Sequence, residues 1–234
     1  AGSNAEVFYE FRTIEKGGMK MIENLTSKGL SIESDSFQVI EGLLKGRSFS
    51  EEELLVVMRV IHATGDPQYE ELMEFHPGAV EAALKAIKEG RDILVDVKMA
   101  ESGISRKILE EFGGETICLI SDSDVIETAK AEGKTRAEVA MEKAVESGRE
   151  IGIVAIGNAP TALMKIMEMV DNGLFRPDLI IGVPVGFIMA EESKTELIRK
   201  DYPFISCRGR KGGSSVAVAA LNALLRIARS NAPA

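Results

Sequence analysis

The chain has 234 residues, of which 45% are hydrophobic and 28% are charged, and its formal net charge is −9. This length suits one large α/β domain or two small ones, and the composition excludes global disorder. The acidic balance argues against broad binding of nucleic acid or of an anionic membrane. No apolar run approaches the roughly 18 residues of a membrane-spanning helix, and the first residues lack the charged and apolar pattern of a signal peptide, so we expect none.

The two cysteines, Cys118 and Cys207, lie far apart and show no CxxC pattern. They are typical of buried thiols in a reducing compartment, so we expect a cytoplasmic protein without disulfides. The opening residues AGSNA resemble an expression remnant or a frayed end, and we infer neither fold nor function from them.

The first part of the chain has helical spacing, at residues 35–46, 50–65 and 77–90. The second segment opens with a Ser-x-x-Glu capping box formed by Ser50 and Glu53, and the third stops at a glycine. We expect this part, through about Gly90, to be helical and to pack on the rest of the chain as one unit.

Five short apolar runs follow, at residues 93–97, 116–120, 151–156, 179–183 and 204–206. Helical segments alternate with them, at residues 105–112, 136–147, 160–172, 191–200 and 214–228. This alternation predicts an α/β fold with a mostly parallel sheet flanked by helices, on which the helical N-terminal part packs.

In such sheets ligands bind beyond the carboxyl ends of the strands. The third apolar run ends in the sequence GNAPTAL, where Gly157 allows close approach of the backbone and Pro160 suits a helix start. Free N–H groups there would favour an anion. The sequence lacks a P-loop and a GxGxxG fingerprint, so the turn holds either another anionic group or no ligand.

The fifth apolar run is followed by CRGRKGGSS, which brings Arg208, Arg210 and Lys211 ahead of a helix start at Gly213 and Ser214. This segment is either a solvated basic loop or an anion-binding loop, and the glycine pair favours the second interpretation.

His62 stands near the end of a predicted helix, with Arg59 three residues earlier on the same face. A histidine in this place commonly caps the helix carbonyls. The alternative is a general acid beside an anion-binding arginine, because imidazole exchanges protons near neutral pH.

Other polar residues favour structural roles. His76 precedes a proline at a helix start, and Asp122 and Asp124 are typical of turn and N-cap residues rather than of a Mg²⁺ site. Two histidines without suitably spaced carboxylates predict no metal site. Met164, Met167 and Met169 are expected in the core.

Four segments together carry a resemblance: IHATGD, VAIGNAPTAL, GVPVGF with EESK close behind, and RGRKGGSSVAVAALNALL. In order and spacing they resemble the precorrin-8X methylmutase family, which includes the cobalt-precorrin-8 methylmutases. The resemblance covers a single domain at residues 32–234. Residues 1–31 form an N-terminal extension without an assigned role.

The resemblance implies an isomerase of cobalamin biosynthesis that moves a methyl group from C11 to C12 of (cobalt-)precorrin-8 and forms hydrogenobyrinate or cobyrinate. This 1,5-sigmatropic shift needs no redox cofactor and no protein-bound metal. His62 matches the family's proton donor. Ser36, Arg59 and the pair Thr135 and Arg136 match its substrate contacts. The resemblance also implies a homodimer with the site near the interface.

The substrate is a broad, largely apolar ring edged with carboxylates, and arginine bonds carboxylates through its planar fork. On this interpretation Gly157, Asn158, Arg208, Arg210, Gly213 and Ser214 hold carboxylates and ring edges. Three other functions stay open: a Rossmann-like oxidoreductase or transferase, a non-catalytic tetrapyrrole carrier, and a small-molecule-binding regulator.

Overall fold

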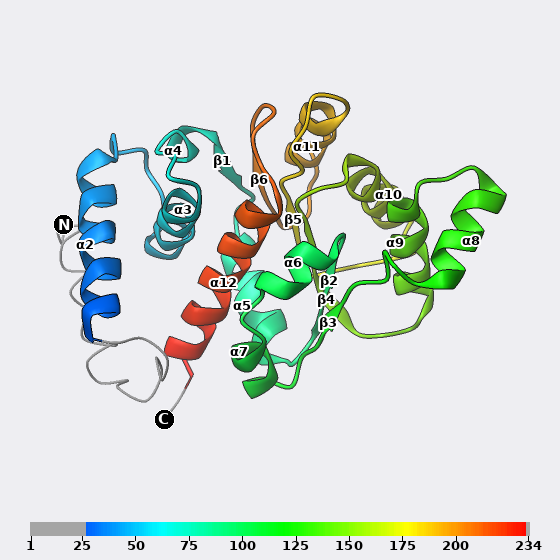
Figure 1. Ribbon diagram of the computed structural model, residues 1–234, viewed down its shortest axis with the longest axis horizontal. Coiled ribbons are helices and arrows are strands. Elements are labelled where there is room, and N and C mark those ends of the chain that lie inside the picture. Colours follow the sequence, from blue (N-terminus) through cyan, green and yellow to red (C-terminus); the bar gives the residue numbers. More distant parts are fainter. Residues whose placement is uncertain (1–26, 233–234) are drawn as a thin grey trace.

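The computed structural model describes residues 27–232 as a six-stranded sheet between two layers of helices (Figure 1). The spatial order of the strands is β1-β6-β5-β4-β2-β3. Five of the six are parallel, and only β1 runs antiparallel, against β6. The predicted α/β fold with a mostly parallel sheet is confirmed.

The strands are β1 (Met73–Phe75), β2 (Asp92–Val95), β3 (Thr116–Ile117), β4 (Ile151–Ile156), β5 (Leu179–Gly182) and β6 (Phe204–Cys207). Alternate residues of the central strands enter two separate cores. Ile153 and Ala155 of β4 face one core, and Val154 and Ile156 face the other. Burial on both faces explains why these strands read as unbroken apolar runs.

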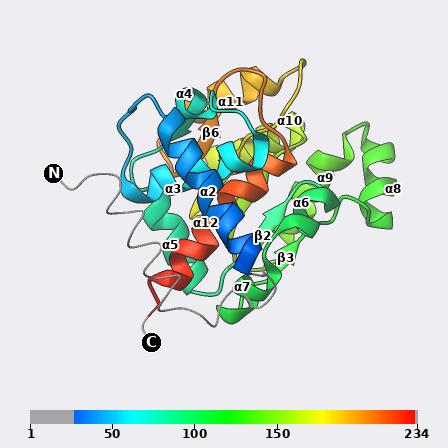
Figure 2. The same ribbon diagram turned by 60° about the vertical axis from the view of Figure 1, so that its left-hand side comes forward.

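One face of the sheet is covered by α3 (Glu51–Thr64), α5 (Ala79–Lys88), α6 (Lys98–Gly103), α7 (Arg106–Glu111) and α12 (Ser214–Ser230). Outside them lies α2 (Ser27–Leu43), which Figures 1 and 2 both show as the outermost helix of this layer. The short helix α4 (Tyr69–Leu72) leads into β1. The apolar helix α12 buries ten of its 17 residues, because the sheet and α3 pack on it from two sides.

The other face is covered by α8 (Ser123–Glu132), α9 (Arg136–Glu146), α10 (Pro160–Asp171) and α11 (Ala190–Ile198). Figure 1 shows these helices on the side of the sheet away from α2 and α3. Among the described residues, no helix is long and apolar enough to cross a membrane.

The N-terminal part departs from its prediction in one respect. It is helical and packs on the α/β body, but Met73–Phe75 form the edge strand β1, paired with residues Ile205–Cys207. The run is only three residues long, so it gives no alternating pattern by which a strand is recognised. Of the predicted N-terminal extension, residues 1–26 lie outside the described part of the chain, and α2 begins at Ser27.

Candidate active site

The carboxyl ends of the parallel strands lead into the segments for which we predicted ligand binding from the sequence. The order of strands has a switch point between the parallel neighbours β2 and β4. β3 is added beside β2 on one side, whereas β5 and β6 are added beyond β4 on the other side. In open α/β sheets such a switch point is the usual place for a ligand crevice. The residues directly after β2 and β4 therefore lie at the expected position of a ligand crevice.

Asp96 follows β2 and is completely buried. Its carboxylate accepts hydrogen bonds from the backbone N–H groups of Gly157 (3.3 Å), Asn158 (2.7 Å) and Ala159 (2.8 Å). Burial raises the pKa of Asp96, while these N–H donors act in the opposite direction. The turn at the start of α10 thus holds an anion that belongs to the protein itself.

This contact changes the interpretation of the glycine turn. The sequence led us to expect free N–H groups at the start of α10, and the structure shows that expectation to be wrong for residues 157–159. The side chain of Asn158 is exposed and stays a candidate contact. Asp96 itself was missed, although an aspartate inside the run ILVDV is a visible signal in the sequence.

Gly157 is also tied to the start of α12. A Cβ atom added to Gly157 would lie 2.6 Å from Ser214 Cα and 2.7 Å from the carbonyl oxygen of Gly213. The lack of a side chain at Gly157 is therefore explained by this close packing of two backbones. The contact places Gly157, Gly213 and Ser214 side by side at the strand ends.

The loop after β6 carries three cations, and each has an acidic partner. Arg208 Nε lies 2.8 Å from Glu74, and Arg210 Nε lies 3.9 Å from Glu191. Both arginine side chains remain about two-thirds exposed. The Arg210–Glu191 pair is exposed on both sides and is therefore weak, whereas Glu74 is only 16% exposed; both guanidinium groups still present surface to a substrate carboxylate.

Lys211 connects the same loop to the segment after α3 and to α11. The Lys211 ammonium pairs with Asp66, just beyond α3, and donates to Gln68 Oε1 at 2.6 Å. The Lys211 carbonyl accepts a hydrogen bond from the Lys194 ammonium.

Lys194 is fully buried beside Cys207, with 3.7 Å between Nζ and Sγ. Burial lowers the pKa of Lys194 and raises that of the Cys207 thiol, because it disfavours the charged form of each group. The expectation of buried cysteines is confirmed for Cys118 and Cys207. Lys194 was missed as a buried residue, because nothing in the sequence EESK marks its lysine as internal.

His62 lies in the last turn of α3, which ends at Gly65 in a left-handed conformation. Its exposed imidazole stacks on Phe37 of α2, with 5.1 Å between ring centroids and 11° between planes. The guanidinium of Arg59 lies 4.6 Å from the centroid of the same Phe37 ring. Phe37 therefore fixes the relative positions of both predicted residues.

Glu33 completes this cluster. It forms an ion pair with Arg59, and Arg226 of α12 approaches it to 3.5 Å. Burial acts to raise the pKa of Glu33, but the charge and hydrogen bond of Arg59 outweigh it and hold the pKa below its ordinary value. Ser36 lies on the same helix and donates its hydroxyl to the carbonyl of Ile32 at 2.7 Å.

Thr135 and Arg136 begin α9 on the opposite face of the sheet. Thr135 forms a capping box with Glu138, and its hydroxyl lies 3.0 Å from that of Thr161 in the first turn of α10. The pair thus adjoins the Asn158 turn. Arg136 is exposed, and within residues 27–232 no ion pair or hydrogen bond is found for its guanidinium.

The predicted site residues therefore fall into two groups within one copy of the chain. Gly157, Gly213 and Ser214 lie together at the strand ends. Asn158, Arg208 and Arg210 belong to the same two segments, and Thr135, next to Arg136, reaches the first turn of α10 through Thr161. Ser36, Arg59 and His62 lie on α2 and α3 of one helical layer. Arg59 and His62 share the ring of Phe37, and Arg59 pairs with Glu33, while Ser36 donates to the carbonyl of Ile32 within α2.

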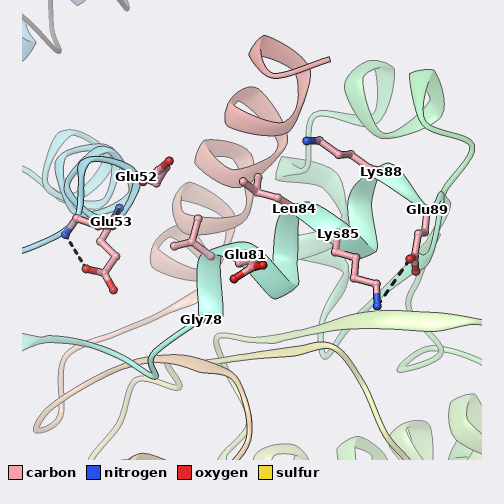
Figure 3. A pocket seen from close by; sticks show the side chains of 10 residues that line it. Glu52, Glu53, Gly78, Glu81, Leu84, Lys85, Lys88 and Glu89 are labelled. Atoms are coloured by element: carbon pink, nitrogen blue, oxygen red, sulfur yellow. Dashed lines mark hydrogen bonds and ion pairs between the residues drawn. The ribbon is translucent and has the colours of Figure 1, made fainter. Parts of the chain in front are cut away.

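A pocket of about 690 Å³ lies elsewhere, between the start of α3 and α5 (Figure 3). Its charged lining mixes both signs, with Glu52, Glu53, Glu81, Lys85, Lys88 and Glu89. Ser50 at this pocket is twelve residues before His62, which corresponds to roughly 18 Å along a helix. None of the predicted site residues lines it, so we do not assign it to the substrate. Within the described part of the chain, no cluster of three or more His, Cys, Asp or Glu could hold a metal ion.

Comparison with known proteins supports the resemblance seen in the sequence. A family model described as precorrin-8X methylmutase matches residues 31–227. A cobalt-precorrin-8 methylmutase from Priestia megaterium is 45% identical over 206 residues, which are 88% of this chain and 91% of the relative. A precorrin-8X methylmutase from Pseudomonas aeruginosa is 42% identical over 201 residues, 84% of this chain and 94% of the relative.

A solved structure is similar in fold as well. The precorrin-8x methyl mutase from Thermus thermophilus superposes with a TM-score of 0.79 at 44% sequence identity. The alignment covers 86% of this chain and 96% of that chain. The residues matched by the family model, 31–227, include α3 and every strand-end segment.

Proposed function

Because the chain belongs to the precorrin-8X methylmutase family, an isomerase family of cobalamin biosynthesis, we propose that it moves a methyl group from C11 to C12 of precorrin-8X or of cobalt-precorrin-8. The product is hydrogenobyrinate in the first case and cobyrinate in the second. The observation that carries this proposal is the family match over residues 31–227, which includes both groups of candidate residues.

His62 is the proposed general acid. Protonation of the macrocycle weakens the bond to the migrating methyl group, and general acid catalysis typically contributes about a hundred- to ten-thousand-fold. The exposed ring at the end of α3 is open to a ligand on its free side, and stacking on Phe37 limits its rotation. A fixed donor contributes more because less orientation is lost on reaching the transition state.

Arginines are the proposed partners of the substrate carboxylates. Arg136 is exposed, and the side chains of Arg208 and Arg210 remain about two-thirds exposed beside their partners Glu74 and Glu191. Asn158, Thr135 and Ser214 supply further polar contacts at the same edge. The proposed shift is intramolecular, so these residues need only bind and orient the ring, with no redox cofactor and no metal held by the protein.

We also propose a homodimer with the site near its interface. His62 and Arg59 belong to one helical layer, whereas Thr135 and Arg136 lie on the other face of the sheet. A second copy can bring the start of its α9 to the α2–α3 layer of the first. At a low substrate concentration, a mixture of the impaired His62→Ala and Arg136→Glu proteins should then be more active than either protein alone. If the site lies within one protomer, mixing should give no gain. The cytoplasm is the proposed location.

The decisive experiment is single-turnover kinetics beside a titration with the coloured product. His62→Ala should keep product affinity within a few-fold, while turnover falls by roughly a hundredfold or more, because a proton donor acts in the transition state. His62→Asn should fail almost as badly, since an amide cannot supply a proton. His76→Asn, at the other histidine, is the matched control.

Three outcomes decide between functions. Conversion by wild-type protein and loss in both His62 variants support the isomerase. Wild-type turnover in both variants would assign His62 to helix capping. A wild-type protein that binds the ring without converting it would be a carrier. Parallel assays with metallated and metal-free precursors identify the natural substrate by their kcat/KM values.

A further inference from the structure

The segment between β5 and α11 exposes an unusual run of apolar side chains. Val185 is 47% exposed, Phe187 83%, Ile188 80% and Met189 42%. Contiguous apolar surface of this kind marks a site of interaction in a folded protein. We call Val185–Met189 the apolar loop.

The apolar loop is fixed in place at several points. The N–H of Val185 donates to the Gly157 carbonyl at 3.3 Å, and the N–H of Gly186 donates to the Arg210 carbonyl at 3.2 Å. At its end, Ala190 is fully buried at the start of α11. These bonds join the apolar loop to both segments that the proposed function assigns to substrate binding.

Met189 holds a strained conformation. Its φ is 60°, and it is the one non-glycine residue with a positive φ in the described part of the chain. The left-handed region is unfavourable for a residue with a side chain, because its Cβ atom lies too close to the following carbonyl oxygen. Such strain persists where the surrounding structure imposes it, and it commonly occurs at ligand sites.

The surroundings of the apolar loop match a ligand that is apolar at its centre and anionic at its edge. The Arg210 guanidinium lies 5.7 Å from the centroid of the Phe187 ring. Met99 of α6 and Met164 of α10 follow the neighbouring strands β2 and β4 and are also exposed. The expectation that Met164 belongs to the core is wrong, while Met167 and Met169 are buried.

We infer that the apolar loop is the contact surface for the face of the tetrapyrrole ring, with Phe187 and Ile188 against the ring and Arg210 meeting a carboxylate at its edge. This inference rests on the proposed function and adds the surface on which the ring lies. The cation at the border of the surface is the reason to assign an acidic macrocycle to it rather than a second copy of the chain.

The test is the double variant Phe187→Ser with Ile188→Ser. Both side chains are exposed, so the fold should persist. Product Kd and KM should each rise by about tenfold or more, with kcat at saturation within a few-fold, since the lost contact serves substrate and transition state alike. Leu174→Ser is the matched control. Leu174 is 68% exposed, but it precedes β5 and so lies toward the amino end of that strand, away from the carboxyl ends where the apolar loop lies.

Arg210→Gln tests the edge contact separately. It should weaken binding of the free-acid product several-fold and leave binding of the fully esterified product unchanged, because the ester carries no charge to pair with. An equal loss for both ligands would overturn the role of Arg210 at a carboxylate.

The remaining outcomes are distinct. If wild-type protein converts the precursor and the double variant keeps wild-type Kd and KM, the inference fails and the proposed function stands. If light scattering shows that the double variant becomes monomeric while each protomer keeps its product affinity, the surface covers a second copy and the inference is wrong. If wild-type protein neither binds nor converts the ring, the proposed function fails, and this inference with it.

Discussion

The carboxylate of Asp96 lies 2.7 Å from the backbone nitrogen of Asn158, and an internal anion therefore occupies the start of α10. Two strands that are neighbours in the sheet but separated by more than fifty residues of chain are joined by this bond. At the switch point of the sheet, the backbone N–H groups of residues 157–159 therefore already have a partner in Asp96. A ligand bound there would contact exposed side chains instead.

Asp96→Asn should destabilise the protein by about 1–3 kcal/mol, because an amide oxygen cannot serve three N–H donors and its NH₂ group faces them. The free energy of unfolding, from urea denaturation, measures this. Asp122→Asn is the control, since Asp122 is exposed and its side chain makes no capping bond to α8. Equal stability of the two variants would show that the Asp96 bonds contribute nothing.

The sequence predicted where this turn lies but not what fills it. The strand β4 is recognised because its six residues are all apolar, and Pro160 marks the helix that follows. The partner of the turn is fixed by strand order, which places β2 beside β4 although β3 intervenes in the chain. A long-range contact of this kind leaves no local pattern in the sequence.

Gly157→Ala should lower the free energy of unfolding by about 1–3 kcal/mol, because the added methyl group meets the backbone of Gly213 and Ser214 and one of the two segments must move. Thermal or urea unfolding measures the loss. Gly42→Ala on α2 is the control, since a Cβ there has open space and alanine favours a helix. A Gly157→Ala protein as stable as wild type would contradict this packing.

Glu33→Gln should destabilise the protein by roughly 1 kcal/mol at pH 7, because it removes the charge that faces Arg59 and Arg226. The pKa of Glu33 is lower in the folded chain than its ordinary 4.5. The contribution is therefore complete above pH 4.5 and is lost as the pH falls through the lower folded-state pKa.

The difference between wild type and Glu33→Gln should shrink accordingly on acidification. Urea denaturation at pH 7 and at several points below pH 4.5 tests this. Glu41→Gln, on the same helix, is the control. A difference that stays constant with pH would show that the ion pair does not contribute through its charge.

Lys194→Met should change how stability depends on pH. The pKa of Lys194 is lower in the folded chain than its ordinary 10.5, because the buried ammonium loses its hydration. Between the folded-state pKa and 10.5 the unfolded chain binds more protons, so this residue makes stability rise with pH. The variant should lack this slope, and Lys130→Met, at an exposed site on α8, should keep it. Denaturation from pH 7 to pH 10 measures both.

The fold could be predicted further than the site. The capping box of Ser50 and Glu53 and the ends of α3 follow from local signals and are confirmed. The paired cations of the loop after β6 could not be foreseen, because Arg208 finds Glu74 through the antiparallel pairing of β1 with β6. The α2 contacts of His62 were missed for the same reason, since helical spacing shows a buried face but not its partner.

Arg136 offers the cleanest test of carboxylate recognition. Arg59→Glu would place two carboxylates against each other at Glu33 and would disturb α2 as well as any ligand. Arg136 is exposed at the start of α9, so Arg136→Glu should leave stability within about 0.5 kcal/mol of wild type. Product affinity should fall at least tenfold, and more at low salt, where a charge interaction is less screened.

Lys130→Glu is the control for the same change of charge, at an exposed site away from the strand-end segments. Titration of the coloured product at two salt concentrations separates local recognition from the effect of net charge on an already acidic protein. Equal losses in both variants would assign the effect to net charge. A loss confined to Arg136→Glu, and reduced by salt, would assign a substrate carboxylate to the start of α9.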